Sequence, residues 1–185
     1  MSATDGAELD RLLLARSVRR GHFVLASGRT SNFYIDCRLT TMSAEGLVLI
    51  GRLGLEAIRA ARWAPKAVGG LTMGADPVAY AVAAASASSP PSIDAFSVRK
   101  EAKSHGTARR IEGNFGAGDP VVIIEDVITT GGSAAKAIEA VRAEGASVLG
   151  VLAVVDREEG GRAHLEAMGV RVVALTTSRR LGLLN

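Results

Sequence analysis

The sequence has few of the features that mark secreted or membrane proteins. Cys37 is its one cysteine among 185 residues, which excludes an internal disulfide and fits a reducing compartment. No run approaches the roughly 18 uninterrupted apolar residues of a membrane span. The stretch from Met1 to Asp5 leads into a charged segment and does not read as a signal peptide. We therefore expect a cytoplasmic protein with no membrane segment.

Aromatic residues are also scarce, at 4% of the chain, which disfavours a base-stacking platform for single-stranded nucleic acid. Two common phosphate motifs are missing: the P-loop pattern and the Gly-x-Gly-x-x-Gly turn after a strand. The charge balance is mildly basic, with a net charge of +3 and a pI of about 9.4. This balance suits phosphorylated substrates and would also suit weak nucleic-acid binding.

Length and pattern predict one α/β domain. The chain can form one proper core but is short for two, and 48% of its residues are hydrophobic. From Ala67 onward, short apolar strands alternate with helices, and Asp76-Pro77 is interpreted as the cap and first turn of an Ala-rich helix. Before that, Phe23 to Arg38 has the alternation of a hairpin, and Ser43 is expected to cap a helix. We predict a mainly parallel, twisted sheet flanked by helices, in a single domain over residues 1–185.

The most informative stretch runs from Val121 to Ser133. An apolar strand there delivers Glu125 and Asp126 to its carboxyl end, where open α/β sheets bind ligands. The residues from Thr129 onward turn into a helix N-terminus, whose backbone N–H groups and dipole favour a phosphate. The two carboxylates would repel that phosphate and suit ribose hydroxyls or hydrated Mg²⁺. We interpret the stretch as a ribose-5-phosphate site; the alternative is two solvated acids before an ordinary glycine-rich turn.

This stretch resembles the phosphoribosyl diphosphate signature of the type I phosphoribosyltransferases. Further stretches narrow the resemblance to the orotate phosphoribosyltransferase family; they span residues 25–34, 69–77, 98–106 and 155–157. The family joins orotate to phosphoribosyl diphosphate, giving orotidine 5′-monophosphate and pyrophosphate in pyrimidine (UMP) biosynthesis. The resemblance implies the type I phosphoribosyltransferase fold, with a small N-terminal hood at about residues 1–40 and a core at about 41–185.

The resemblance also implies roles for individual residues. The residues expected to bind phosphoribosyl diphosphate are Arg99, Lys100, Lys103, His105, Glu125, Asp126, Thr129, Thr130, Gly131, Gly132 and Ser133. Those expected beside orotate are Phe33, Tyr34, Thr129 and Arg157. Lys103, His105 and Asp126 are the expected catalytic residues. Mg²⁺ is the expected cofactor, held mainly by substrate and water with no direct protein ligand.

The family's quaternary structure implies a homodimer in which the loop Arg99–Asn114 reaches the neighbouring subunit's site. No nucleic-acid or membrane partner is expected. The chain departs from many members at Ala26 and Gly74, where they carry lysine, and Arg29 is the nearest candidate to compensate. Two competing functions stay open: the same transfer to another base, and an RNA-binding regulator that senses phosphoribosyl diphosphate.

Simpler structural interpretations also stay open for several of these residues. The loop cations around Lys100 could form an ordinary solvated segment. Phe33 and Tyr34 could be core residues of the hood, and Arg157 could be a surface or helix-capping residue.

Overall fold

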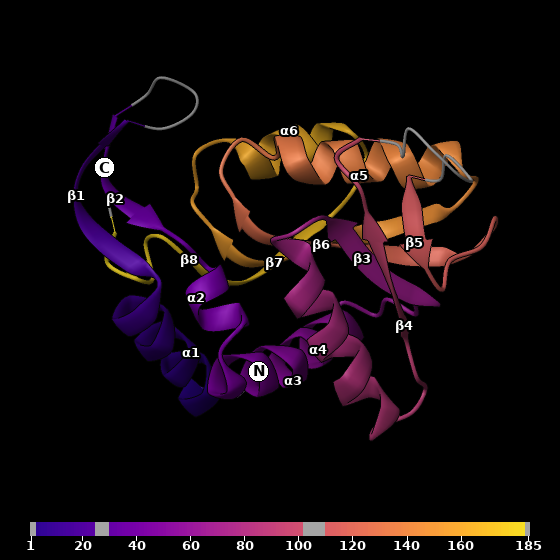
Figure 1. Ribbon diagram of the computed structural model, residues 1–185, viewed down its shortest axis with the longest axis horizontal. Coiled ribbons are helices and arrows are strands. Elements are labelled where there is room, and N and C mark those ends of the chain that lie inside the picture. Colours follow the sequence, from indigo (N-terminus) through magenta and orange to yellow (C-terminus); the bar gives the residue numbers. More distant parts are fainter. Residues whose placement is uncertain (1–2, 25–29, 102–109, 184–185) are drawn as a thin grey trace.

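The computed structural model describes residues 3–24, 30–101 and 110–183, and it is built from eight strands and six helices (Figure 1). In chain order they are α1 (Ala3–Arg16), β1 (Val18–Val24), β2 (Thr30–Ile35), α2 (Arg38–Thr41), α3 (Ala44–Ala60), β3 (Ala67–Leu71), α4 (Ala75–Ala87), β4 (Asp94–Val98), β5 (Ile111–Gly113), β6 (Pro120–Ile128), α5 (Gly132–Ala143), β7 (Ser147–Asp156), α6 (Gly161–Ala167) and β8 (Val172–Thr177).

The main sheet has six strands in the order β5-β4-β3-β6-β7-β8. All neighbouring pairs are parallel except β4 and β5. The central strands β3 and β6 are buried almost throughout, as expected for parallel strands covered on both faces. Helices α1, α3 and α4 lie on one face, and α5 and α6 lie on the other (Figure 1). This arrangement confirms the predicted α/β class and the mainly parallel sheet.

Alternation along β6 divides its side chains between two hydrophobic cores. Val122 and Ile124 pack in the core under α3 and α4, whereas Val121 and Ile123 pack in the core under α5. Both cores have fully buried aliphatic side chains. Among the residues that the structure describes, no helix combines the length and the apolar character needed to cross a bilayer.

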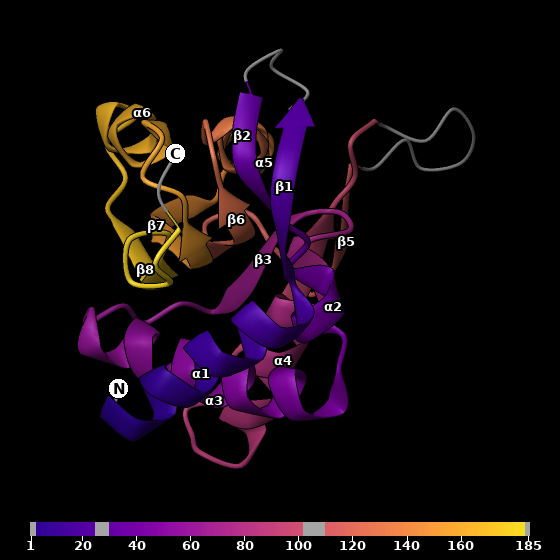
Figure 2. The same cartoon turned by 90° about the vertical axis from the view of Figure 1, so that its left-hand side faces the viewer.

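Strands β1 and β2 form a separate antiparallel ribbon that faces the carboxyl ends of the central strands (Figures 1 and 2). Along β2, buried Phe33 and Ile35 alternate with exposed Asn32 and Tyr34. The predicted hairpin is present but displaced, because pairing already starts at Val18. Arg38, expected at its end, instead opens α2. The expected turn at residues 27–29 lies outside the described residues.

Candidate active site

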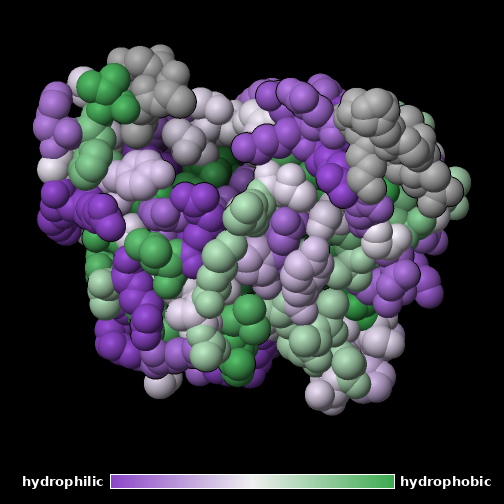
Figure 3. Space-filling view, viewed as in Figure 1, coloured by the Kyte–Doolittle hydropathy of each residue, from purple (hydrophilic) through white to green (hydrophobic). Residues whose placement is uncertain are grey.

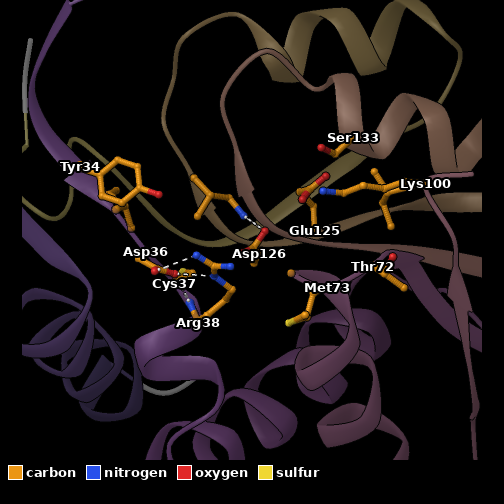
Figure 4. A pocket seen from close by; sticks show the side chains of 14 residues that line it. Tyr34, Asp36, Cys37, Arg38, Thr72, Met73, Lys100, Glu125, Asp126 and Ser133 are labelled. Carbon is orange, nitrogen blue, oxygen red and sulfur yellow. Dashed lines mark hydrogen bonds and ion pairs between the residues drawn. The ribbon is translucent and has the colours of Figure 1, made fainter. Parts of the chain in front are cut away.

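A cavity of about 350 Å³ lies at the carboxyl ends of β3 and β6, where the ribbon and α2 face the sheet (Figure 4). Its volume falls within the range of small-molecule sites. We call it the central cavity. It is lined by Tyr34, Ile35, Asp36, Cys37, Arg38, Leu71, Thr72, Met73, Gly74, Lys100, Glu125, Asp126, Val127 and Ser133.

The predicted acid pair lies at the floor of this cavity, near the end of β6. Because successive strand residues point to opposite faces, Glu125 turns toward α5 and Asp126 toward α4. Glu125 is 7% exposed, and its burial raises the pKa of its carboxyl well above the ordinary range, with the charge of Asp126 adding to the effect. Asp126 is half-buried, and its Oδ1 accepts the N–H of Val127 at 3.0 Å. Burial therefore favours the protonated form of the Glu125 carboxyl by raising its pKa.

The predicted phosphate loop connects β6 to α5 beside the acid pair. Gly131 adopts a left-handed conformation (φ 79°), and α5 begins at Gly132; among the described residues no side chain caps this start. The first N–H groups of such a helix have no partner within it and can bind an anion. From behind, α6 supports the loop, since Gly161 N–H donates to the carbonyl of Thr129 at 3.0 Å. Ser133 lines the central cavity, and the other loop residues, Thr129 to Gly132, connect it to Val127, which also lines the cavity.

The residues predicted for orotate are divided between the cavity wall and the layer behind it. Tyr34 is 40% exposed and lines the central cavity. Phe33 is buried, and its ring centroid lies 4.5 Å from the Arg157 guanidinium. The Arg157 side chain is itself only 4% exposed. It donates from Nε to Glu159 Oε1 at 2.8 Å and from Nη2 to Ser31 Oγ at 3.1 Å. Arg157 is therefore a buried cation held against β2, the strand whose Tyr34 lines the cavity.

Of the residues predicted for the diphosphate, the structure describes Arg99 and Lys100. Lys100 follows β4 and reaches into the cavity (Figure 4). The Nε of Arg99 instead binds Glu112 of β5 at 3.2 Å, and its side chain is partly exposed. Lys103 and His105 lie outside the described residues. Part of the long loop expected after β4 forms β5, which returns antiparallel along β4.

Sequence reasoning missed one wall of the cavity. Asp36, Cys37 and Arg38 form it at the start of α2, opposite the turn that precedes α4. Hydrogen bonds from Arg38 lower the pKa of the Asp36 carboxyl, whereas burial raises the pKa of the Cys37 thiol well above its ordinary value. The signal in the sequence was an acid and an arginine directly after an alternating strand. Among the described residues, no group of three His, Cys, Asp or Glu side chains is arranged to hold a metal ion.

The parallel sheet and the strand, loop and helix around the acid pair define a phosphoribosyltransferase. Accordingly, residues 43–172 match the family model described as phosphoribosyl transferase domain. An orotate phosphoribosyltransferase from Sorangium cellulosum is 47% identical over 184 residues, covering 97% of this chain and 95% of the relative. One from Aquifex aeolicus is 46% identical over 171 residues, covering 91% and 92%.

Solved structures agree with these relatives. The crystal structure of Mycobacterium tuberculosis orotate phosphoribosyltransferase in complex with Fe(III) dicitrate has a TM-score of 0.86 and 45% identity, covering 97% of this chain and 99% of that one. The same enzyme in complex with phosphoribosyl diphosphate has a TM-score of 0.82 and 42% identity, with the same coverage. The chain belongs to the orotate phosphoribosyltransferase family.

Proposed function

We propose that this chain transfers the 5-phosphoribosyl group from phosphoribosyl diphosphate to orotate, forming orotidine 5′-monophosphate and pyrophosphate for pyrimidine biosynthesis. The observation that carries the proposal is the meeting of Glu125, Asp126 and the uncapped start of α5 at one cavity, in a member of this family. Acids suited to ribose hydroxyls beside an anion-binding helix start match a ribose 5-phosphate ester.

In this proposal the phosphate loop Thr129–Ser133 binds the 5′-phosphate, and Glu125 and Asp126 bind the ribose hydroxyls. The hydrogen bond from the N–H of Gly161 to the carbonyl of Thr129 holds the loop and supports a preorganised phosphate site. Because burial favours the protonated form of Glu125 by raising its pKa, this carboxyl could donate one hydrogen bond to the sugar and accept others.

The reaction breaks the bond from the ribose anomeric carbon to a diphosphate oxygen and forms one to the orotate ring nitrogen. Positive charge grows on the sugar while negative charge grows on the pyrophosphate, so fixed charges of opposite sign should stabilise each. Asp126 lies on the sugar side of this scheme. Lys100 would face the pyrophosphate, and Arg99, Lys103 and His105 would add their positive charge to it, with Arg99 sharing or leaving its contact with Glu112. No covalent nucleophile is needed.

We assign the orotate ring to the side of the cavity formed by the hood, at about residues 1–40, which faces the core at about residues 41–185. Tyr34 would contact the ring from the cavity wall, with Phe33 behind it and Thr129 at the ring edge. Arg157 would supply the positive charge that a carboxylated base requires. Because Glu159 and Ser31 occupy Arg157 in the structure, orotate would have to share these contacts or replace them.

Mg²⁺ is the cofactor that this chemistry calls for, since it binds diphosphate oxygens and offsets their charge. The donors in the cavity fit such an ion, because Asp126 and Asp36 are incompletely buried carboxylates that line the central cavity. We propose that they contact Mg²⁺ through water, while the substrate supplies direct ligands.

We also propose a cytoplasmic two-fold homodimer in which the loop Arg99–Asn114 completes the neighbouring site. An apolar surface over α2, α3 and α4 supports an interface there (Figure 3). Its exposed large side chains are Leu39, Met42, Val48, Met73 and Tyr80. Large exposed apolar patches of this kind commonly mark protein contacts.

The function is tested by incubating the purified protein with phosphoribosyl diphosphate, Mg²⁺ and one base at a time. Loss of orotate absorbance with release of one pyrophosphate per orotate consumed is the expected result. Adenine, hypoxanthine and uracil are the comparison bases, and they should react far more slowly. Faster consumption of another base would reassign the substrate, and failure with every base would favour a binding protein for phosphoribosyl diphosphate.

A further inference from the structure

The central cavity has few positive charges for the substrate proposed above. Among the described residues that line it, the acids are Asp36, Glu125 and Asp126, whereas the cations are Arg38 and Lys100. Phosphoribosyl diphosphate carries charge on its 5′-phosphate and on its diphosphate. With the 5′-phosphate at the start of α5, the diphosphate must lie elsewhere in the cavity, beside cations that offset its charge.

Arg38 is held in a defined orientation on the wall opposite Lys100 (Figure 4). Its Nε and Nη2 donate to the two carboxylate oxygens of Asp36 at 2.8 and 3.0 Å. The backbone N–H of Arg38 donates to the same carboxylate at 3.2 Å, which fixes the acid as well. An arginine has five N–H donors in a rigid plane, so this pair leaves donors for another acceptor. The Arg38 side chain is 47% exposed and therefore accessible from the cavity.

The turn before α4 lies between Arg38 and Lys100 but cannot supply a cation of its own. A Cβ at Gly74 would lie 2.5 Å from Asp126 Oδ1 and 2.7 Å from its Oδ2. Position 74 therefore admits no side chain while Asp126 keeps its place. Arg38 and Met73 line the central cavity together, and they also line the shallow depression beside it. Arg38 and the turn therefore border the same two hollows.

We infer that Arg38 binds the diphosphate of phosphoribosyl diphosphate and that Asp36 positions it. The inference rests on the function proposed above and adds a residue to it. The diphosphate lies between Lys100 on one side and Arg38 on the other, at the turn from Thr72 to Gly74. Arg38 thereby supplies, from the hood side, a positive charge that position 74 cannot carry.

The test compares steady-state kinetics of Arg38→Ala, Arg38→Lys and Asp36→Asn with those of the intact chain. A charge-assisted contact predicts that Arg38→Ala raises KM for phosphoribosyl diphosphate, and KM for pyrophosphate in the reverse reaction, by about ten- to a hundredfold. KM for orotate should change less than about twofold. Arg38→Lys should recover part of the loss, because it keeps the charge but not the paired geometry. Asp36→Asn should raise the same two constants to a smaller degree.

Arg52→Ala is the matched control. Arg52 also donates to both oxygens of one acid, Asp5, and is 48% exposed, but it lies on α3 away from the cavity. Its kinetic constants should equal those of the intact chain. Unchanged KM for phosphoribosyl diphosphate in both Arg38 variants, or an equal rise in KM for orotate, overturns the inference while leaving the function intact. An intact chain that transfers nothing to orotate overturns both.

Discussion

At the scale of single residues, the site depends on a buried cation, Arg157, that is enclosed partly by residues from a distant part of the chain. Arg157 follows β7, yet it lies against Phe33 and Ser31 of β2. Its closest charged partner is Glu159, and both side chains are less than a tenth exposed. Burying such a pair is tolerated only while both members are present.

Arg157→Ala should therefore cost stability as well as orotate binding. Removing one member of this buried ion pair predicts a loss of about 3–5 kcal/mol in the free energy of unfolding. Denaturant titration measures this loss. The double variant Arg157→Gln, Glu159→Gln should recover much of it, and its KM for orotate should rise more than its KM for phosphoribosyl diphosphate. An Arg157→Ala protein that is as stable as the intact chain would contradict the assignment of Arg157 and Glu159 as a structural ion pair.

Glu125 should make stability depend on pH. Burial raises the pKa of its carboxyl in the folded state, so its contribution to stability is complete below its ordinary pKa of about 4.3 and is lost as pH rises through the raised value. Glu125→Gln removes this titration. The variant should gain stability relative to the intact chain as pH rises from about 4 toward neutrality. Denaturant titrations at several pH values check this; a difference independent of pH would contradict it.

The cavity residues show what a sequence can and cannot predict at this scale. Glu125, Asp126 and the glycine-rich loop are adjacent in the chain, so their joint chemistry is readable directly. Arg38 and the turn at Gly74 line the same cavity although they are far apart in the sequence. No local sequence pattern indicates that they lie together. The side chain of Arg99, predicted to bind the diphosphate, has Glu112 as a partner in the structure because β5 returns along β4, and sequence alone does not indicate this contact.

At the scale of elements, the alternation of apolar strands and helices was sufficient to predict the sheet and the helices on both faces. Ser43 was predicted as a cap, and it does accept the N–H of Gly46 at 3.2 Å before α3. The prediction of Asp76 as the N-terminal cap of α4 was wrong, because α4 already begins at Ala75. The Asp76 carboxylate instead accepts the hydroxyl of Ser97 on β4 at 2.7 Å, a tertiary contact that sequence does not show.

The phosphate loop packs closely against the start of α6, and adding one methyl group at Gly161 tests this packing. A Cβ at Gly161 would lie 2.5 Å from Ile128 Cγ2 and 2.6 Å from the carbonyl oxygen of Thr129. Gly161→Ala should therefore displace the loop, lowering the free energy of unfolding by about 1–3 kcal/mol and raising KM for phosphoribosyl diphosphate. Gly132→Ala is the stability control, because its Cβ would meet only Thr130 Oγ1 at an ordinary 3.7 Å. Equal stability of the two variants would contradict this packing.

At the scale of the whole molecule, the proposed homodimer predicts that sites are shared between subunits. In this scheme Lys103 acts on the neighbouring subunit's site, and Asp126 acts on its own. Lys103→Ala and Asp126→Asn proteins should each be nearly inactive. Refolded together, they form heterodimers in which one site carries both defects and the other none. Random pairing in a two-fold dimer should restore about a quarter of normal activity.

Two controls belong to that experiment. Each variant refolded alone should stay inactive, and the formation of heterodimers should be verified with differently tagged chains. If Lys103 served its own subunit's site, every site would keep one defect. A mixture with verified heterodimers but no recovered activity would therefore contradict the shared-site arrangement.

If phosphoribosyl transfer takes place over the acid pair at the end of β6, Asp126→Asn should have a large effect on kcat. Losing a contact that stabilises charge in the transition state should lower kcat and kcat/KM together by about a hundredfold or more. Asp94→Asn, at an exposed acid where β4 begins, is the control and should keep normal kinetics. A folded Asp126→Asn protein that turns over orotate with near-normal kcat would contradict the account.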